Sequence, residues 1–178
     1  GAKVVSPEGM ERVLNGEWEW PDTIWTRELP TFDTPYVATV DADFEILEPG
    51  FVRHALELLR ADLKLAGVST NYEPDNPEFL NPYDGRTLYL HQRWHAWFCI
   101  YRKNCLNAGV SHYYHETTAP DGTIHAYDAG GYLQHALLDQ GWRFASLEPE
   151  WKPQFIHYTA FAQNQTINAI NVAAYRRY

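Results

Sequence analysis

The segment YVATVDADFEILEPGF, residues 36–51, constrains the fold more than any other part of the chain. Residues 36–40 form an apolar, β-branched run that leads directly to Asp41 and Asp43, one residue apart. Such a run predicts a buried strand, and residues 48–62 continue with apolar side chains at helical spacing. A strand, a polar turn and a helix in succession predict an α/β fold. In such folds ligands gather at the carboxyl ends of the strands, where the two aspartates stand.

Two carboxylates this close repel each other, and burial increases the repulsion. We therefore expect a cation beside Asp41 and Asp43, or a solvated site. Carboxylate oxygens are hard ligands that suit Mg²⁺ or Mn²⁺, and such an ion can neutralise a phosphate leaving group. The alternative is that one of the two aspartates only caps the turn or helix that follows.

The remaining sequence predicts one domain spanning residues 1–178, which is long enough for a substantial core. The predicted strands are 2–5, 36–40, 66–74 with its turn, 96–102, 142–147 and a segment near 155–158. The predicted helices start at Pro7, near residue 48, within 87–106, at residue 131 and after Asn168, and Gly141 ends the fourth of them. The predicted loops are 17–35, 75–85 and the polar, histidine-rich stretch 108–131.

Composition narrows the function. The formal net charge of −9, without a basic run longer than two residues, argues against nucleic acid and anionic membranes as partners. No apolar run approaches the ~20 residues that a transmembrane helix needs. Cys99 and Cys105 match no zinc signature, and two such cysteines indicate a reducing, cytoplasmic location or simple packing. Aromatic residues make up 15%, and their flat faces suit a sugar ring or a large core.

Three segments, taken in order, resemble the glycosyltransferases with the GT-A fold, especially the inverting family 2 group. They are TPYVATVDADFEILEPGFVRHALELLRA around the D-x-D pair, HAYDAGGYLQHALLDQGW around an acidic residue before a helix, and FIHYTA around a late histidine. The resemblance covers roughly residues 34 to 160. It implies an α/β fold with a GT-A-like mixed, mostly parallel sheet flanked by helices.

The resemblance also implies roles for individual residues. Asp43 and His157 would bind Mn²⁺ or Mg²⁺, and Asp41 would face the donor's ribose or the surroundings of the ion. Asp128 would be the base that deprotonates an acceptor hydroxyl, which then displaces the nucleoside diphosphate with inversion. The partners would be a nucleotide-sugar donor and a hydroxyl-bearing acceptor. The chemistry is consistent, because a sugar hydroxyl needs a positioned base and a diphosphate leaves only when its charge is met.

Further substrate contacts are expected near Asp128. Trp94 and Trp97 offer flat faces for a sugar or the acceptor, although packing is the alternative. Tyr127 adjoins the acidic residue, and the Gly130-Gly131 pair lets the backbone approach a ligand or the sheet. A dinucleotide-binding loop is not expected, because no G-x-G-x-x-G pattern surrounds this pair.

Several of these residues have other interpretations. Asp128 precedes Ala-Gly-Gly and suits a helix N-cap, and His157 suits a hydrogen-bonded core position. His91 and His95 would share one face of a helix and could bind zinc, although no third ligand is evident.

The chain also departs from the resemblance. Only 40 residues precede Asp41, which implies a shortened or missing N-terminal nucleotide-binding segment, and the acidic motif is Tyr-Asp-Ala rather than Glu-Asp. Two other functions stay open: a non-catalytic carbohydrate- or nucleotide-binding module, and a Mg²⁺-dependent phosphotransfer enzyme. The latter class usually has threonine soon after the second aspartate, whereas Phe44 and Glu45 follow here.

Overall fold

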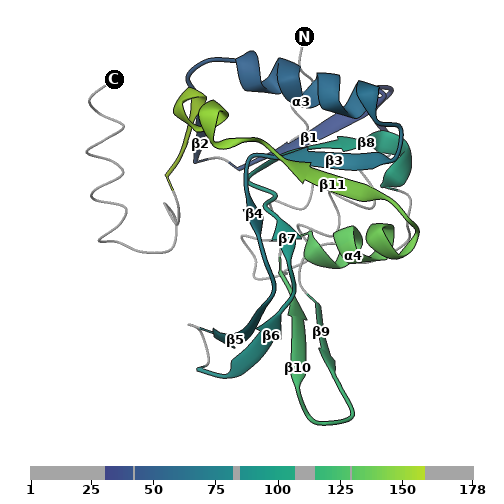
Figure 1. Ribbon diagram of the computed structural model, residues 1–178, viewed down its shortest axis with the longest axis vertical. Coiled ribbons are helices and arrows are strands. Elements are labelled where there is room, and N and C mark those ends of the chain that lie inside the picture. Colours follow the sequence, from purple (N-terminus) through teal and green to yellow (C-terminus); the bar gives the residue numbers. More distant parts are fainter. Residues whose placement is uncertain (1–30, 42, 82–84, 107–114, 129, 159–178) are drawn as a thin grey trace, which may run out of the picture.

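The computed structural model describes residues 31–41, 43–81, 85–106, 115–128 and 130–158 (Figure 1). The strand predicted at 2–5, the helix predicted from Pro7, most of the loop predicted at 17–35 and the helix predicted after Asn168 lie outside these residues.

A four-stranded sheet, here called the central sheet, has the order β1-β8-β3-β11. Its strands are β1 (Tyr36–Val40), β8 (Phe98–Arg102), β3 (Leu65–Ser69) and β11 (Arg143–Ser146). β8 is antiparallel to both β1 and β3, and β11 is parallel to β3. β1, β3 and β11 therefore run in one direction, and their carboxyl ends meet at the same edge of the sheet.

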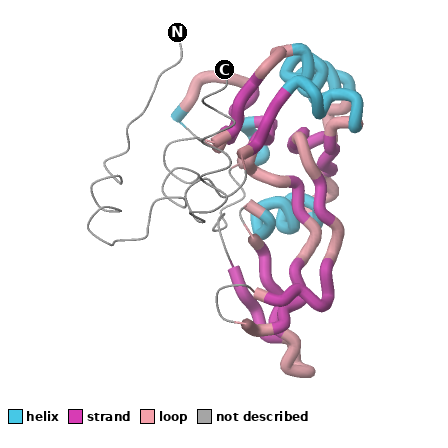
Figure 2. Tube along the Cα trace, turned by 90° about the vertical axis from the view of Figure 1, so that its left-hand side faces the viewer, coloured by secondary structure: helices cyan, strands magenta, loops and turns pink. Residues whose placement is uncertain are grey.

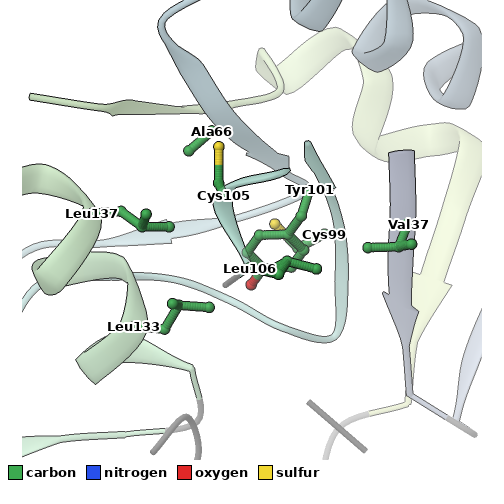
Figure 3. Packing of buried hydrophobic residues seen from close by; sticks show 8 residues of the cluster. All are labelled: Val37, Ala66, Cys99, Tyr101, Cys105, Leu106, Leu133 and Leu137. Atoms are coloured by element: carbon green, nitrogen blue, oxygen red, sulfur yellow. The ribbon is translucent and has the colours of Figure 1, made fainter. Parts of the chain in front are cut away.

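Two α-helices cover opposite faces of the central sheet, α3 (Gly50–Ala61) and α4 (Gly131–Asp139) (Figure 1). Successive side chains of β8 point to opposite faces of the central sheet, so the strand contributes to a hydrophobic core on each face. Phe98 and Ile100 pack in the cluster that contains α3 side chains, and Tyr101 packs in the cluster that contains α4 side chains. Fully burying each large apolar side chain contributes about 1.5–3 kcal/mol, so both helices are held by their apolar faces. The α4-side cluster, drawn in Figure 3, consists of Val37, Ala66, Cys99, Tyr101, Cys105, Leu106, Leu133 and Leu137.

A second four-stranded sheet, here called the distal sheet, projects away from the central sheet at the end opposite α3 (Figures 1 and 2). In spatial order its strands are β5 (Asn76–Leu80), β6 (Thr87–Leu90), β10 (Ile124–Tyr127) and β9 (His115–Thr118). Only the β6–β10 pairing in this sheet is parallel.

Two short antiparallel ribbons complete the described fold. β4 (Tyr72–Glu73) pairs with β7 (Arg93–Trp94) between the two larger sheets (Figure 1). β2 (Phe44–Ile46) pairs with β12 (Phe155–His157) beside the end of β1. The 3₁₀ helix η3 (Lys103–Cys105) follows β8, and the 3₁₀ helix η4 (Pro149–Gln154) precedes β12.

The predicted α/β fold, with a GT-A-like, mostly parallel sheet flanked by helices, is wrong. The described strands form four separate sheets, and six of their eight pairings are antiparallel. The prediction failed because most strands outside the central sheet are only two to five residues long and carry polar side chains. They therefore lack the apolar periodicity that identifies a strand in a sequence.

Individual elements were predicted with mixed success. The strands at 36–40 and 142–147 and the helices at 48–62 and 131–140 are confirmed within a residue or two. The loop predicted at 108–131 is wrong, because it contains β9 and β10, and the loop predicted at 75–85 is wrong, because it contains β5. This strand tolerates Pro77 because it lies at the sheet edge, where the missing N–H is not needed. Within 87–106 the strand predicted at 96–102 is confirmed as β8, whereas the helix predicted beside it is wrong, since β6 and β7 occupy that part.

Among the described residues, no helix has both the length and the apolar character required to cross a membrane.

Candidate functional site

Asp41, Asp43 and His157, here called the metal triad, meet although the histidine lies more than a hundred residues after the aspartates. Asp41 is the first residue beyond β1, and its N–H donates a hydrogen bond to the Trp97 carbonyl at 2.8 Å. β12 pairs with β2 so that His157 lies opposite Phe44, the residue after Asp43. The Tyr158 N–H donates to the Asp43 carbonyl at 2.9 Å and extends this pairing by one step.

The side chains of the metal triad converge on one point. His157 Nε2 lies 3.3 Å from Asp43 Oδ1 and 3.7 Å from Asp41 Oδ2. One ligand atom from each residue lies within 4.8 Å of the other two, and no other group of three such side chains does so in the described part of the chain. Adjacent ligands of an octahedral ion with bonds near 2.1 Å lie about 3 Å apart, so these distances suit a shared cation.

Exposure differs across the metal triad. The side chain of Asp41 is 48% exposed, that of Asp43 19% and that of His157 10%. The His157 ring stacks on Trp97, with ring centroids 4.0 Å apart, and Phe44, which stacks on Phe155, lies at a tilt 6.3 Å from the His157 ring. Aromatic rings therefore hold the imidazole, while Asp41 opens the site to solvent.

Asp128 lies between β10 and α4, and its carboxylate forms an ion pair with Arg93 Nη1 from β7. The same guanidinium donates through Nε and Nη2 to Glu73 Oε2, at 2.9 and 2.6 Å. Glu73 and Arg93 are directly opposite each other in the β4–β7 ribbon. One cation, only 14% exposed, therefore sits between two carboxylates.

A continuous chain of contacts joins this pair to the metal triad. His95 Nε2 lies 3.2 Å from Glu73 Oε2, and the His95 ring lies 4.0 Å from the Trp97 ring. Trp97 in turn stacks on His157. Burial, with the positive charge of Arg93 second, lowers the pKa of His95 to about 4. His95 is therefore neutral at pH 7, and its Nε2–H can donate to the Glu73 carboxylate.

Gln134 fixes α4 to the ribbon. Its fully buried amide accepts from the Trp94 N–H at 2.9 Å and donates to the Trp94 carbonyl at 2.7 Å. The two bonds tie α4 to the residue after Arg93. Asp128, which precedes α4, is thereby held at a set distance from Arg93.

The other predicted substrate-binding residues surround Asp128 with different roles. Gly130 takes the N-cap position of α4 at φ +79°, a left-handed conformation that favours glycine, so the cap position is not that of Asp128. Gly131 is buried as the first residue of the helix. Tyr127 stacks on His91 with centroids 4.3 Å apart. Trp94 packs between Tyr72 and Phe144, whereas Trp97 contacts the metal triad.

The zinc site considered for His91 and His95 does not form, because no helix connects them. His91 Nε2 instead hydrogen-bonds to His125 Nδ1 at 2.9 Å, and these two residues are here called the distal histidine pair. His91 Nδ1 lies 3.6 Å from Asp75 on the other side. The pair is part of a cluster of half-buried rings on the distal sheet and α4: Tyr89, His91, His115, His125, Tyr127, Tyr132 and His135.

Sequence reasoning missed Glu73, Arg93 and Gln134. Glu73 and Arg93 are twenty residues apart in strands of two residues, so no local pattern indicates their pairing. Gln134 sits inside an apolar stretch, GYLQHALL, and a polar residue at such a position was the one available signal. Buried polar groups need partners, and this one finds them on β7.

No protein-family model, no curated protein and no solved structure matches this chain.

Proposed function

We propose that the metal triad binds a divalent cation and that the chain transfers a sugar from a nucleotide-diphospho-sugar to an acceptor hydroxyl. The observation that carries this proposal is the convergence of Asp41, Asp43 and His157 at the carboxyl end of β1. The resemblance of the three sequence segments to inverting glycosyltransferases supports the same reaction.

The ligand set favours Mn²⁺ over Mg²⁺. Carboxylate oxygens suit both ions, whereas imidazole nitrogen suits the transition metals better. The ion would supply positive charge to the diphosphate of the donor and so stabilise it as a leaving group. Asp41, the most exposed ligand, leaves one side of the site open to such a substrate.

Asp128 is the proposed base. Its side chain is 42% exposed, so an acceptor hydroxyl can approach it, and a chain of contacts through Arg93, Glu73, His95 and Trp97 connects it to the metal triad. The carboxylate would accept the proton of the hydroxyl while the oxygen attacks the anomeric carbon and the diphosphate departs. Arg93 orients the carboxylate before the substrate arrives.

A second candidate is a module that binds the nucleotide sugar without transferring it. The ion pair between Asp128 and Arg93 favours this candidate, because a carboxylate held by a guanidinium is a weaker base. Both candidates require the metal triad, and they differ only in the chemistry at Asp128.

Thermal unfolding with UDP and GDP, each with and without Mn²⁺, tests the shared requirement. A ligand that binds the folded state at 100 times its Kd adds about 2.7 kcal/mol of stability, so the nucleotide should raise Tm only when Mn²⁺ is present. A Tm that does not respond to the combination contradicts both candidates.

Incubation with a panel of nucleotide sugars and Mn²⁺ then separates them. Transfer or slow hydrolysis that falls about 10²–10⁴-fold in Asp128→Asn, with an unchanged Tm response to nucleotide, supports the transferase. Nucleotide-sugar binding without turnover supports the module.

A further inference from the structure

Glu73 is placed to control how Arg93 meets Asp128. Its Oε2 receives two N–H groups of Arg93 and faces His95 Nε2 at 3.2 Å, so three donors surround a single oxygen. Glu73 and Arg93 are directly opposite each other in the β4–β7 ribbon, so the strand pairing fixes the distance between their backbones and keeps the two side chains in contact. Arg93 is thereby left with Nη1 for Asp128.

The geometry limits the ion pair that Arg93 can form with Asp128. A free guanidinium prefers to bind a carboxylate through two parallel N–H groups, which is the strongest arrangement. Here Glu73 occupies the side of the guanidinium formed by Nε and one N–H of Nη2, so Asp128 meets Arg93 at the other end, where Nη1 contacts it. The negative charge of Glu73 also offsets part of the positive charge that Asp128 experiences.

We propose that Glu73 is a positioning residue for the base of the proposed transfer reaction. It holds Arg93 so that the guanidinium orients Asp128 without fully neutralising it. This inference rests on the proposed function for its catalytic consequence, but its electrostatic consequence at Asp128 can be measured without any turnover.

Glu73→Gln tests the proposal, because the amide keeps the shape of the side chain and removes its charge. Arg93 then turns fully to Asp128. The Asp128 carboxyl titration, followed by ¹³C NMR, should move to lower pH, and kcat should fall about 10-fold or more with KM and Mn²⁺ affinity nearly unchanged. The matched control is Glu116→Gln, which removes the charge from another cross-sheet pair, where Arg86 contacts both Glu116 oxygens at 3.1 and 2.9 Å. The control should leave the titration and kcat unchanged.

A double-variant comparison separates positioning from a loss of folding. If Glu73 acts through Arg93, Glu73→Gln adds little to the loss of kcat already produced by Arg93→Met. Equal effects of Glu73→Gln in the presence and absence of Arg93 contradict the proposal, as does an Asp128 titration that does not move. A moved titration in a protein without transfer activity supports the role of Glu73 and contradicts the proposed transferase instead.

Discussion

The metal triad and the distal histidine pair are built from the same kinds of side chain and differ in how these are arranged. In the metal triad, one imidazole nitrogen faces two carboxylates, and three ligand atoms converge. In the distal sheet the groups lie in series: Asp75 faces one nitrogen of His91, and the other nitrogen is bonded to His125. The ligand atoms of the metal triad point at one position and can surround a cation there. The groups of the distal sheet point at one another, so they share protons and leave no common position for a cation. Composition alone therefore does not identify a metal site.

The largest expected effect is on metal affinity. Asp43→Ala removes a ligand, and because changes to groups that merely support metal ligands already cost 10–100-fold, we expect a loss of Mn²⁺ affinity of about 100-fold or more. Asp75→Ala removes the carboxylate beside the distal histidine pair and should leave the affinity unchanged. Titration of Mn²⁺ followed by electron paramagnetic resonance measures both. Equal losses in the two variants would abolish the distinction between the regions, and tight binding in Asp43→Ala would remove Asp43 from the site.

His95, which connects the Glu73–Arg93 pair to the metal triad, should dominate the pH dependence of stability. Its pKa of about 4 in the folded state lies below the 6.5 expected when unfolded, so the unfolded chain takes up the proton first. This contribution to stability is complete above pH 6.5 and is lost as pH falls toward 4. Between pH 7 and pH 5 the loss should be about 2 kcal/mol.

Chemical denaturation at pH 7 and pH 5 measures that loss as a difference between the wild type and His95→Gln. The glutamine variant retains a polar side chain and lacks the titration, so its stability should change less over this interval. Identical pH dependence in the two proteins would show that the pKa of His95 does not change on folding, which contradicts the prediction.

The parts of the fold that the sequence predicted correctly are those with strong local signals. The apolar run that ends at Asp41, the amphipathic helix after Pro49 and the helix that Gly141 terminates each carry periodicity or a stop signal within one segment. The distal sheet carries none, since β9 reads His-Glu-Thr-Thr and β10 reads Ile-His-Ala-Tyr. These segments form strands because they pair with neighbouring strands, and their own residues carry no strand pattern.

The same distinction applies to the site. The D-x-D pattern after a strand singled out Asp41 and Asp43, and the resemblance added His157 as a ligand and placed Asp41 toward the donor or the surroundings of the ion. The structure brings the three side chains together. Glu73 and Arg93 were not predicted, because their meeting depends on a ribbon only two residues long. Long-range pairing of such short strands is decided by the packing of the larger sheets on either side, which no local window contains.

The smallest expected effect belongs to the distal histidine pair. A single N–H···N bond joins His91 to His125, so at most one proton can lie between the two nitrogens, and a second would set two N–H groups against each other. Burial, followed by the neighbouring His135 and His125, lowers the pKa of His91. The stability that the neutral His91 contributes to the folded state is therefore lost as pH falls below 6.5. The loss should be smaller than that due to His95, because the His91 side chain is 18% exposed and that of His95 is 7%.

Glutamine in place of His91 should reduce the pH dependence of the stability only slightly. Nitrogen-15 NMR of the imidazoles offers the more direct measurement, because the bonded pair should show one protonated and one unprotonated nitrogen at pH 7. A shift of these resonances on addition of diamagnetic Mg²⁺, at concentrations that saturate the metal triad, would contradict the comparison, since it would place a cation among groups arranged in series.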